Sequence, residues 1–524
     1  YKYLDMMYVD TLNADDVVGG SINYMLRSLD PYTVYYPAED VKDLDLLITG
    51  KYAGIGALIR YDMVLKRVTI DEPYEKQPAA EAGLKKGDIL LAIDNIDITN
   101  KDTKFVSQHL RGDAGTSFIL KVLRPTTNKM MKLKITRRAI QMPAVPYYGL
   151  QENGIGYLSL NQFTTDCSKD VRRAFIEMKT QGMQKLVLDL RNNGGGSLQE
   201  AVNIVNMFVP KGVTLVKTKG RLERANRDYK TTMEPIDTVM PIVVLVNGET
   251  ASSSEITSGS LQDLDRAVVL GTRTYGKGLV QVPIDLPYNG SLKLTTAKYY
   301  IPSGRCIQAI NYKHNKGGYI EHVPDSLTKE FHTLGGRIVR DGGGIKPDIE
   351  VKPDSLPNIA FYLASAGQDS TEVMHNWEMK YIKNHPTIGA AKTFSITDAD
   401  YDDFKQTVIN SGFKYDRESK KYLDQLEKLA KFEGYYDDAK PEFEALEKKL
   451  KHNLAKDLEF NRKTLKQVLS ADLVRVYYYQ RGGIENSLQW DKQWQAATKL
   501  LLNEDEYNKV LAPTIAKQTT ESHK

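Results

Sequence analysis

The segment from residue 141 to 365 constrains the fold most, because short apolar runs alternate there with stretches of helical periodicity. The run Leu186-Val-Leu-Asp-Leu leads into a glycine turn, and a helical pattern follows from about Leu198 to Phe208. Strands that alternate with helices form a sheet whose faces the helices cover. We therefore predict that this segment is the largest domain and has an α/β core.

Three other regions differ from this core in composition. Residues 1–48 combine helical periodicity with a turn-like Asp30-Pro31-Tyr32 and are predicted to form a helical lead-in. Residues 49–140 contain short β-rich runs separated by glycine-bearing turns, which predicts one compact β-rich module. In residues 366–524 the charge density rises, and apolar side chains recur at helical spacing between Leu423 and Phe432. We predict a helical domain there.

The composition argues against several classes of protein. Lys and Arg total 71 against 67 for Asp and Glu, and the net charge of +4 is too small to indicate nucleic acid binding. Cys167 and Cys306 are too few for a disulfide scaffold, and the sequence has no spaced Cys/His set to bind a metal. The apolar runs fall far short of the roughly 20 residues that cross a bilayer. We therefore expect no cofactor, no metal and no membrane span.

A serine cluster and one lysine surround a short predicted helix between Val246 and Gln281. The cluster reads Thr250-Ala-Ser-Ser-Ser-Glu-Ile, and the lysine, Lys277, stands in Tyr-Gly-Lys-Gly. A serine hydroxyl needs a base to take its proton, and a lysine serves as that base only where desolvation lowers the pKa of its amine. The layout indicates a serine–lysine hydrolase.

These motifs resemble the active-site block of the C-terminal processing peptidases, also called tail-specific proteases. The resemblance implies a serine endopeptidase with a Ser/Lys dyad, built on an α/β core of the ClpP/crotonase type. It covers roughly residues 20–355 and includes Leu188-Asp-Leu-Arg-Asn-Asn-Gly-Gly-Gly, Gln262-Asp263, Arg266-Ala267, Ala297-Lys-Tyr-Tyr-Ile-Pro-Ser-Gly and Gly344-Ile-Lys-Pro-Asp-Ile-Glu-Val.

The resemblance also implies a role for each residue of the block. The family's nucleophilic serine lies 25 residues before the lysine, which implies Ser252 as nucleophile and Lys277 as general base. Gln281 would orient the lysine amine, and the backbone N–H groups of Gly196 and Ser253 would form the oxyanion hole. Each residue type also has an ordinary structural use, such as a serine that caps a helix. The motifs taken together, in this order, favour catalysis.

Three further features of this region are interpreted from the same comparison. Asp263 matches an acidic family position, where it would shape the local field or a hydrogen-bond network, although a carboxylate on a helix surface is an equally good interpretation. Glu255 is interpreted as structural, since carboxylates are common near helix starts. The second glycine triplet, Gly342–Gly344, receives no oxyanion role because a strand-like segment follows it.

The β-rich module resembles the PDZ domain of the same family. PDZ domains bind a peptide as an added strand and capture its terminal carboxylate with backbone N–H groups. The resemblance implies that Gly54, Ile55 and Gly56 form this carboxylate loop, although glycines there also permit a tight turn. Peptide binding at the loop would also gate the active site. The matching runs are Tyr52-Ala-Gly-Ile-Gly, Ala80-Glu-Ala-Gly-Leu-Lys-Lys-Gly-Asp-Ile-Leu and Leu110-Arg-Gly-Asp-Ala-Gly-Thr.

Two alternatives stay open at this point. A serine–histidine–acid triad needs a histidine near the serines, and His314 and His322 are the best candidates. A catalytically inert core would instead make the chain a PDZ scaffold or peptide-binding protein. On the main interpretation the substrates are polypeptides with accessible C-termini, and the helical regions are candidates for a homodimer contact. The family's usual location, with Tyr1 in place of an initiator methionine, favours a periplasmic or envelope location.

Overall fold

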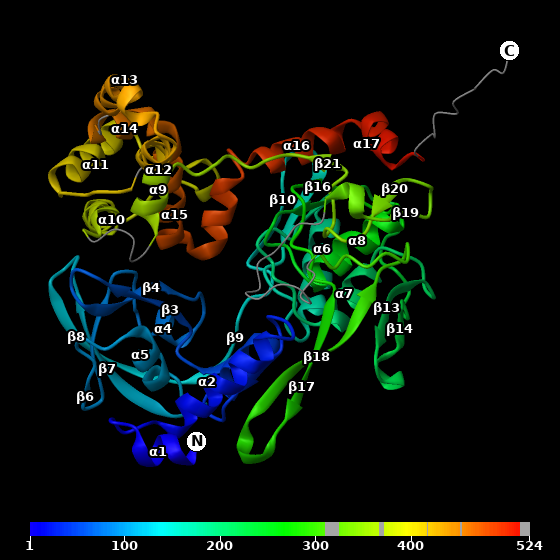
Figure 1. The fold of residues 1–524 in the computed structure, drawn as a ribbon, viewed down its shortest axis with the longest axis horizontal. Helices are drawn as coiled ribbons and strands as arrows, with labels where there is room; N and C mark the ends of the chain where they lie inside the picture. The colour runs from blue at the N-terminus through cyan, green and yellow to red at the C-terminus, as the bar shows by residue number, and fades with distance from the viewer. Residues whose placement is uncertain (310–323, 366–370, 417, 451–452, 514–524) are drawn as a thin grey trace. The chain divides into compact units, whose positions relative to one another are not determined.

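The computed structural model describes residues 1–309, 324–365, 371–416, 418–450 and 453–513. His314 and His322 lie outside the described residues, so the structure does not address a histidine triad built on them. The described chain forms two compact units (Figure 1). The core unit contains Tyr1–Lys51, Gln141–Pro353 and the segment from Asp491, and the second unit contains Tyr52–Ile140 and Asp354–Trp490.

A six-stranded sheet forms the centre of the core unit, with the strand order β10-β11-β12-β15-β16-β21. β10 and β11 are antiparallel, and all other neighbours are parallel. β15 is the apolar run Ile-Val-Val-Leu-Val, whose side chains are all buried, as expected for a strand covered on both faces. The strands are β10 (Tyr147–Leu150), β11 (Ile155–Ser159), β12 (Lys185–Asp189), β15 (Ile242–Val246), β16 (Val268–Gly271) and β21 (Ile349–Glu350).

Helices connect the parallel strands of this sheet. One joins β11 to β12 and another joins β15 to β16, so the carboxyl ends of β11, β12 and β15 meet at the same edge. Open α/β sheets bind their ligands at that edge. Every residue of α8 is buried, which fixes the start of this helix firmly in the core. The helices are α6 (Cys167–Thr180), α7 (Leu198–Val205) and α8 (Ser253–Asp263).

A second sheet of the core unit has the order β1-β18-β13-β14, and β17 pairs with β18 beside it. β17 and β18 form a long antiparallel hairpin (Figure 1), whose register shifts between Val280 and Gln281. The remaining elements here include three N-terminal helices. The bounds are α1 (Lys2–Met7), α2 (Ala14–Arg27), β1 (Val34–Tyr36), α3 (Val41–Thr49), β13 (Thr214–Gly220), β14 (Arg227–Lys230), β17 (Leu279–Asp285), β18 (Ser291–Tyr300), β19 (Glu330–His332) and β20 (Ile338–Arg340).

The segment from Asp491 packs on the main sheet of the core unit. Helix α16 (Lys492–Leu502) contacts β12, β15 and β16, and α17 (Glu504–Leu511) contacts β16. The ring of Trp494 meets that of Tyr157 edge-on, with 5.4 Å between centroids. The helical stretch from residue 366 onward is therefore divided between the two units, and the bounds of the four predicted domains stay a prediction.

The first part of the second unit is a β-rich module. Its sheet has the order β3-β4-β5-β7-β8 with β6 beside β5, and its core includes Val68, Ile70, Leu90 and Leu120, all fully buried. β2 pairs with β9 where the chain enters and leaves the module. The elements are β2 (Lys51–Gly54), β3 (Ala57–Asp62), β4 (Arg67–Pro73), α4 (Pro78–Glu81), β5 (Ile89–Ile93), β6 (Ile96–Asp97), α5 (Thr103–Leu110), β7 (Ser117–Arg124), β8 (Lys129–Thr136) and β9 (Arg138–Gln141).

The rest of the second unit is helical. A separate core around Trp377, Tyr401 and Phe404 holds these helices together. In α12 Leu423 is buried, whereas Phe432 is 89% exposed. Within the described ranges, no helix is both long and apolar enough to span a membrane. The helices are α9 (Asn358–Ala364), α10 (Val373–Asn384), α11 (Asp398–Asn410), α12 (Glu418–Glu433), α13 (Tyr436–Lys449), α14 (Leu454–Phe460) and α15 (Arg462–Ser487).

Candidate active site

The predicted nucleophile, Ser252, follows β15 and immediately precedes α8. Its backbone has φ 56° and ψ −117°, a combination that residues other than glycine rarely adopt. Strained conformations of this kind persist only where the surroundings enforce them, and they gather at functional sites. The Ser252 side chain remains partly exposed.

The three adjacent serines have different surroundings. The Ser253 hydroxyl donates to the carbonyl oxygen of Gly196 at 2.8 Å, and the Ser254 hydroxyl donates to that of Asn193 at 2.9 Å. Both side chains are buried, whereas that of Ser252 is partly exposed. Of the three hydroxyls, only that of Ser252 is open to a substrate.

Glu255 joins the segment of the nucleophile to that of the lysine. One oxygen of its carboxylate accepts from the backbone N–H groups of Ser252 and Lys277, both at 2.9 Å. The other accepts from Gly276 N–H at 2.7 Å and from the Thr274 hydroxyl. Complete burial raises the pKa of Glu255 to about 7, and these hydrogen bonds oppose the shift. One buried carboxylate thus fixes the backbone on both sides of the predicted dyad.

The Lys277 amine lies in a partly desolvated place beside the N-terminal region. Burial lowers the pKa of Lys277 to about 8, and the positive charge of Lys293 lowers it further, against the opposing effect of Glu255 and Asp30. The nitrogen lies 4.6 Å from the centroid of the Tyr32 ring. Within the described chain, no hydrogen bond joins this amine to the Ser252 hydroxyl. The structure therefore holds the amine on the Tyr32 ring and not on the nucleophile.

Gln281 lies on β17, close in sequence to the lysine, but contacts a different partner. Its side-chain amide donates to the Thr295 hydroxyl at 3.1 Å. The register shift between Val280 and Gln281 explains this contact, because a β-bulge redirects the side chains that follow it. Among the described residues, the structure does not bring Gln281 to the Lys277 amine.

The loop after β12 brings the predicted oxyanion-hole residues together. A Cβ added to Gly195 would lie 2.7 Å from the Ala251 carbonyl oxygen, so this backbone touches the segment of the nucleophile directly. Gly196 pairs with Phe163 through a bridge that uses the N–H groups of Phe163 and Ser197 and leaves the Gly196 N–H out. The Ser253 hydroxyl holds the Gly196 carbonyl. These contacts place the Gly196 and Ser253 backbones side by side.

Asp263 lies at the far end of α8 from Ser252. Its carboxylate pairs with the buried guanidinium of Arg305 at 2.8 Å and accepts from Ser303 N–H at 3.0 Å. Burial raises the pKa of Asp263, and Arg305 opposes that shift. Asp263 therefore belongs to a buried polar network behind the site, without a contact to Ser252 or Lys277.

Gly54, Ile55 and Gly56 connect β2 to β3 in the second unit. Their carbonyls serve the module itself: Ile55 O accepts from Ala79 N–H and Gly56 O accepts from Tyr74 N–H. The N–H groups of Gly56 and Ala57 hydrogen-bond to the Tyr52 hydroxyl. Burial raises the pKa of Tyr52 to about 12, so the phenol is neutral at physiological pH. Its hydroxyl therefore contacts one N–H group of the predicted carboxylate loop, that of Gly56, and the N–H group that follows the loop.

Two residues of this site, Tyr32 and Tyr299, were not identified from the sequence, and Glu255 was interpreted only as structural, without its contacts. Tyr32 contacts the lysine amine, Glu255 joins the two segments, and the Tyr299 hydroxyl lies within hydrogen-bond distance of the carbonyl oxygens of both Ser252 and Lys277. Glu255 stands three residues after Ser252, the spacing of a capping box, which is a signal for its contact with the Ser252 N–H. Tyr32 and Tyr299 reach the site only through tertiary pairing, so no local pattern indicates them.

The sequence matches known families in three places. The profile of Peptidase family S41 matches residues 154–320, that of a PDZ domain matches residues 69–124, and that of the C-terminal helical domain of a probable PDZ-protease matches residues 362–501. These matches confirm the predicted α/β multidomain class with a PDZ domain and a helical C-terminal domain.

Two relatives with more than 30% identity support the same assignment. A carboxy-terminal-processing protease of Bartonella bacilliformis is 38% identical over 314 residues, which cover 59% of this chain and 71% of that protein. A probable CtpA-like serine protease of Staphylococcus aureus strain MRSA252 is 33% identical over 321 residues, 60% of this chain and 62% of that protein. Among solved structures, a photosystem II D1 C-terminal processing protease matches with 28% identity and a TM-score of 0.36, over 68% of this chain and 86% of that one. The chain belongs to the carboxy-terminal-processing proteases of peptidase family S41 and is a serine peptidase.

Proposed function

We propose that the protein is an endopeptidase that recognises the C-terminal region of polypeptides through its PDZ domain and cleaves them with the dyad Ser252 and Lys277. The observation that carries this proposal is that Glu255 joins the segment of a partly exposed, strained Ser252 to that of a half-buried lysine whose pKa is lowered to about 8. At neutral pH a useful fraction of such an amine is uncharged, and an uncharged amine can accept the hydroxyl proton.

The proposed reaction has two halves. Lys277 takes the proton from Ser252, and the alkoxide attacks the scissile carbonyl, while the N–H groups of Gly196 and Ser253 stabilise the resulting oxyanion. The ammonium of Lys277 then gives its proton to the leaving amine, and an acyl-enzyme remains. Water, deprotonated by the same lysine, hydrolyses the ester and restores the hydroxyl. No metal or cofactor takes part.

The proposed reaction also requires a movement of the Lys277 side chain. The amine rests on the Tyr32 ring, so it must turn toward the Ser252 hydroxyl, and we propose that Gln281 then changes partner from Thr295 to hold it there. Peptide binding at Gly54–Gly56 would favour this second arrangement. The structure is then a resting form of the site.

A labelling experiment tests the nucleophile. A fluorophosphonate probe should label the wild-type protein at Ser252, as located by mass spectrometry of the labelled peptide. Ser252→Ala should abolish labelling and lower peptide hydrolysis by about 10⁴-fold or more. Ser253→Ala and Ser254→Ala are matched controls, and the label should stay at Ser252 in both. Labelling of Ser252→Ala at another serine would reject the assignment, and no labelling of the wild type would favour an inert PDZ scaffold.

A second experiment tests recognition and gating. Cleavage of fluorescently labelled casein is measured with an added apolar peptide that has either a free C-terminal carboxylate or a C-terminal amide. Because the loop would bind the carboxylate, only the free acid should raise the rate, by several-fold. An equal response to both peptides would contradict carboxylate recognition, and a flat response to both would contradict gating.

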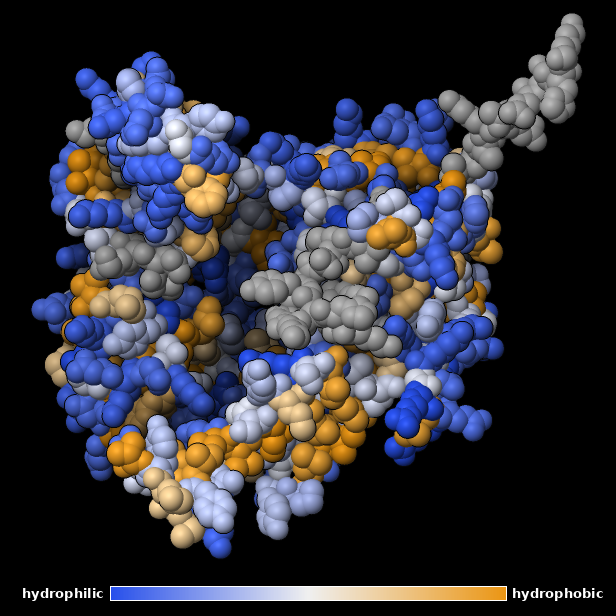
Figure 2. Space-filling view, viewed as in Figure 1, coloured by the Kyte–Doolittle hydropathy of each residue, from blue (hydrophilic) through white to orange (hydrophobic). Residues whose placement is uncertain are grey.

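We also propose a homodimer through the N-terminal helices and a location outside the cytoplasm. Apolar side chains gather on the surface over α1 and α2 (Figure 2), where Tyr3, Met6 and Met7 are exposed. Exposed clusters of this kind commonly mark an interface. Sedimentation should show a dimer. The double substitution Met6→Glu and Met7→Glu should dissociate this dimer, whereas Leu426→Glu on α12 should leave it intact.

Fractionation of the source cell tests the proposed location. The protein should be found outside the cytoplasm, and its recovery with cytoplasmic enzymes would contradict this.

A further inference from the structure

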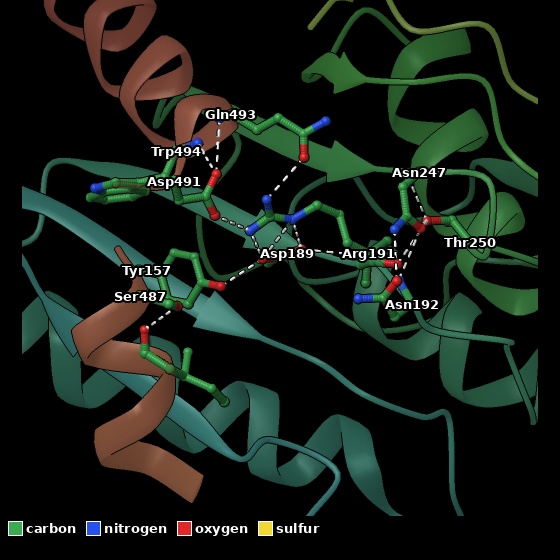
Figure 3. Close-up of polar contacts among 12 residues, drawn as sticks. Tyr157, Asp189, Arg191, Asn192, Asn247, Thr250, Ser487, Asp491, Gln493 and Trp494 are labelled. Atoms are coloured by element: carbon green, nitrogen blue, oxygen red, sulfur yellow. Dashed lines mark hydrogen bonds and ion pairs between the residues drawn. The ribbon is translucent and has the colours of Figure 1, made fainter. Parts of the chain in front are cut away.

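Arg191 occupies a buried site between the main sheet and α16 (Figure 3). It lies two residues after Asp189, and its Nε donates to both oxygens of that carboxylate at 2.9 and 3.0 Å. Its two terminal nitrogens reach the C-terminal segment: one contacts Asp491 at 2.7 Å and the other donates to the Gln493 side-chain oxygen at 2.9 Å. The planar guanidinium thus spans from the end of β12 to the start of α16, with only 16% of its side chain exposed.

Asp491 fixes the start of α16 at the same time. One oxygen of its carboxylate caps the helix by accepting from Gln493 N–H at 2.9 Å and Trp494 N–H at 3.0 Å, while the other faces Arg191. The Gln493 amide donates to the Val351 carbonyl at 2.7 Å, so the helix start is also tied to the segment after β21. A single carboxylate therefore connects the helix cap to the guanidinium.

The residues that follow Arg191 lead directly to the nucleophile. Asn192, with φ 59°, and Asn247 hold each other through two hydrogen bonds of 3.0 and 2.7 Å (Figure 3). Asn193 is fully buried; its side-chain oxygen accepts from Gly195 N–H and its carbonyl accepts from Ala251 N–H and the Ser254 hydroxyl. A displacement of this short segment would therefore move the Gly195–Gly196 backbone and the Ser252 segment together.

The charges explain how Arg191 is held. Asp189 and Asp491 together carry two negative charges against the one positive charge of Arg191, so removal of the Asp491 charge leaves a balanced Arg191–Asp189 pair. Removal of the Asp491 charge therefore does not leave an unpaired buried charge, which would be costly. The guanidinium would nevertheless lose one of its three side-chain partners, which are Asp189, Asp491 and Gln493, and gain freedom to rotate. We expect the protein to fold while the loop after β12 becomes less firmly held.

We propose that Arg191 is a positioning residue for the oxyanion hole and that Asp491 at the start of α16 holds it in place. Helix α16 then helps to maintain the geometry of the protease site, although it lies outside the motifs that contain the proposed dyad. This inference rests on the proposed function, in which the N–H groups of Gly196 and Ser253 stabilise the oxyanion. Positioning matters here because such donors act only when they are directed at the developing charge.

Two substitutions of Asp491 test the proposal in the full-length protein. Asp491→Ser keeps a good helix cap and removes the contact with Arg191, and Asp491→Asn keeps the shape and removes the charge. The matched control is Asn503→Ser, because Asn503 caps α17 by accepting from Glu506 N–H and does not touch Arg191. Circular dichroism should show the same helix content in all three variants.

Kinetic measurements should distinguish a positioning role of Arg191 at the oxyanion hole from a general loss of stability. Both Asp491 variants should lower kcat for labelled casein by about tenfold, with KM within about twofold, and should slow fluorophosphonate labelling of Ser252 by a similar factor. The pH at which activity rises should not move, because Lys277 is untouched. Wild-type kcat in both variants would overturn the proposal, as would an equal loss in Asn503→Ser or a shifted pH profile. A wild type that fails to label at Ser252 would instead overturn the proposed function.

Discussion

Two glycine triplets of the core unit have the same composition and contact the segments of the two residues of the predicted dyad. In Gly194–Gly196, a Cβ added to Gly195 would meet the Ala251 carbonyl oxygen and Ser252 Cβ, both at 2.7 Å. In Gly342–Gly344, a Cβ added to Gly344 would meet the Thr274 carbonyl oxygen at 2.6 Å, three residues before Lys277. The first triplet therefore packs on the segment of the serine, and the second packs on the segment of the lysine.

This comparison shows that glycine allows a close approach of two backbones in both places, while only the first triplet is predicted to present an N–H group to a substrate. The amide of Gly344 donates to Ile307 O, and the neighbouring Ile345 N–H donates to the Thr274 hydroxyl. The Gly344 N–H is thus occupied within the core unit, and the residue after the triplet, Ile345, holds the lysine segment through Thr274. The prediction that the second triplet has no oxyanion role stays a prediction, but its contact with Thr274 was not anticipated.

The largest expected effect concerns the first triplet. Gly195→Ala should lower kcat by about 10²- to 10³-fold, because Gly195 has φ +97° and its new methyl group would displace the predicted oxyanion donors. Gly194→Ala is the matched control, since an added Cβ there meets nothing within 4 Å. Steady-state kinetics on labelled casein measures both. Equal kcat values for Gly195→Ala and Gly194→Ala would contradict the prediction that the Gly195 backbone positions the oxyanion donors.

A smaller effect is expected for the second triplet. Gly344→Ala should push the Thr274 segment away and let water reach the Lys277 amine, which raises the pKa of that amine toward its usual value. At pH 7.5 kcat/KM should fall by about tenfold or more, and much of the loss should be recovered near pH 10. Gly343→Ala is the control, because its Cβ would meet only the end of the flexible Arg273 side chain. If the loss of kcat/KM did not depend on pH, the contact of Gly344 with Thr274 would not act through the Lys277 amine.

The sequence alone predicted those features of the core unit that depend on residues close together in the chain. The strand–glycine turn–helix pattern around Leu198 and the serine cluster at the start of α8 are local. They predicted the α/β class and, through the family resemblance that they carry, a serine peptidase, both confirmed. The Lys277 contact with Tyr32 and the Gln281 contact with Thr295 depend on the pairing of β1 and β17 with β18, which no local pattern determines. The packing of α16 on the main sheet is likewise a long-range contact.

The pH dependence of wild-type activity reports directly on the pKa of the Lys277 amine. A lysine is protonated below its pKa and uncharged above it, so kcat/KM should rise with pH and level off above about pH 8. Tyr32→Ala should expose the amine and move this rise to higher pH, with a several-fold loss at pH 7 and little change at pH 10. Tyr36→Ala, at the end of β1 and beside Lys293, is a control. Coincident profiles for wild type and Tyr32→Ala would show that the ring does not shield the amine.

A third glycine loop, Gly54–Gly56 in the second unit, extends the comparison and carries the smallest expected effect. The Tyr52 hydroxyl accepts from Gly56 and Ala57 N–H groups there, so a peptide carboxylate that binds these groups must displace it. Tyr52→Phe removes the competing oxygen and keeps the ring, so a free-acid peptide should bind several-fold more tightly by calorimetry, whereas its C-terminal amide gains little. Tyr61→Phe, in the same module, is the control. Weaker binding by Tyr52→Phe would mean that the hydroxyl orients the loop, as the Ser253 hydroxyl and the Asn193 side chain hold the first triplet of the core unit.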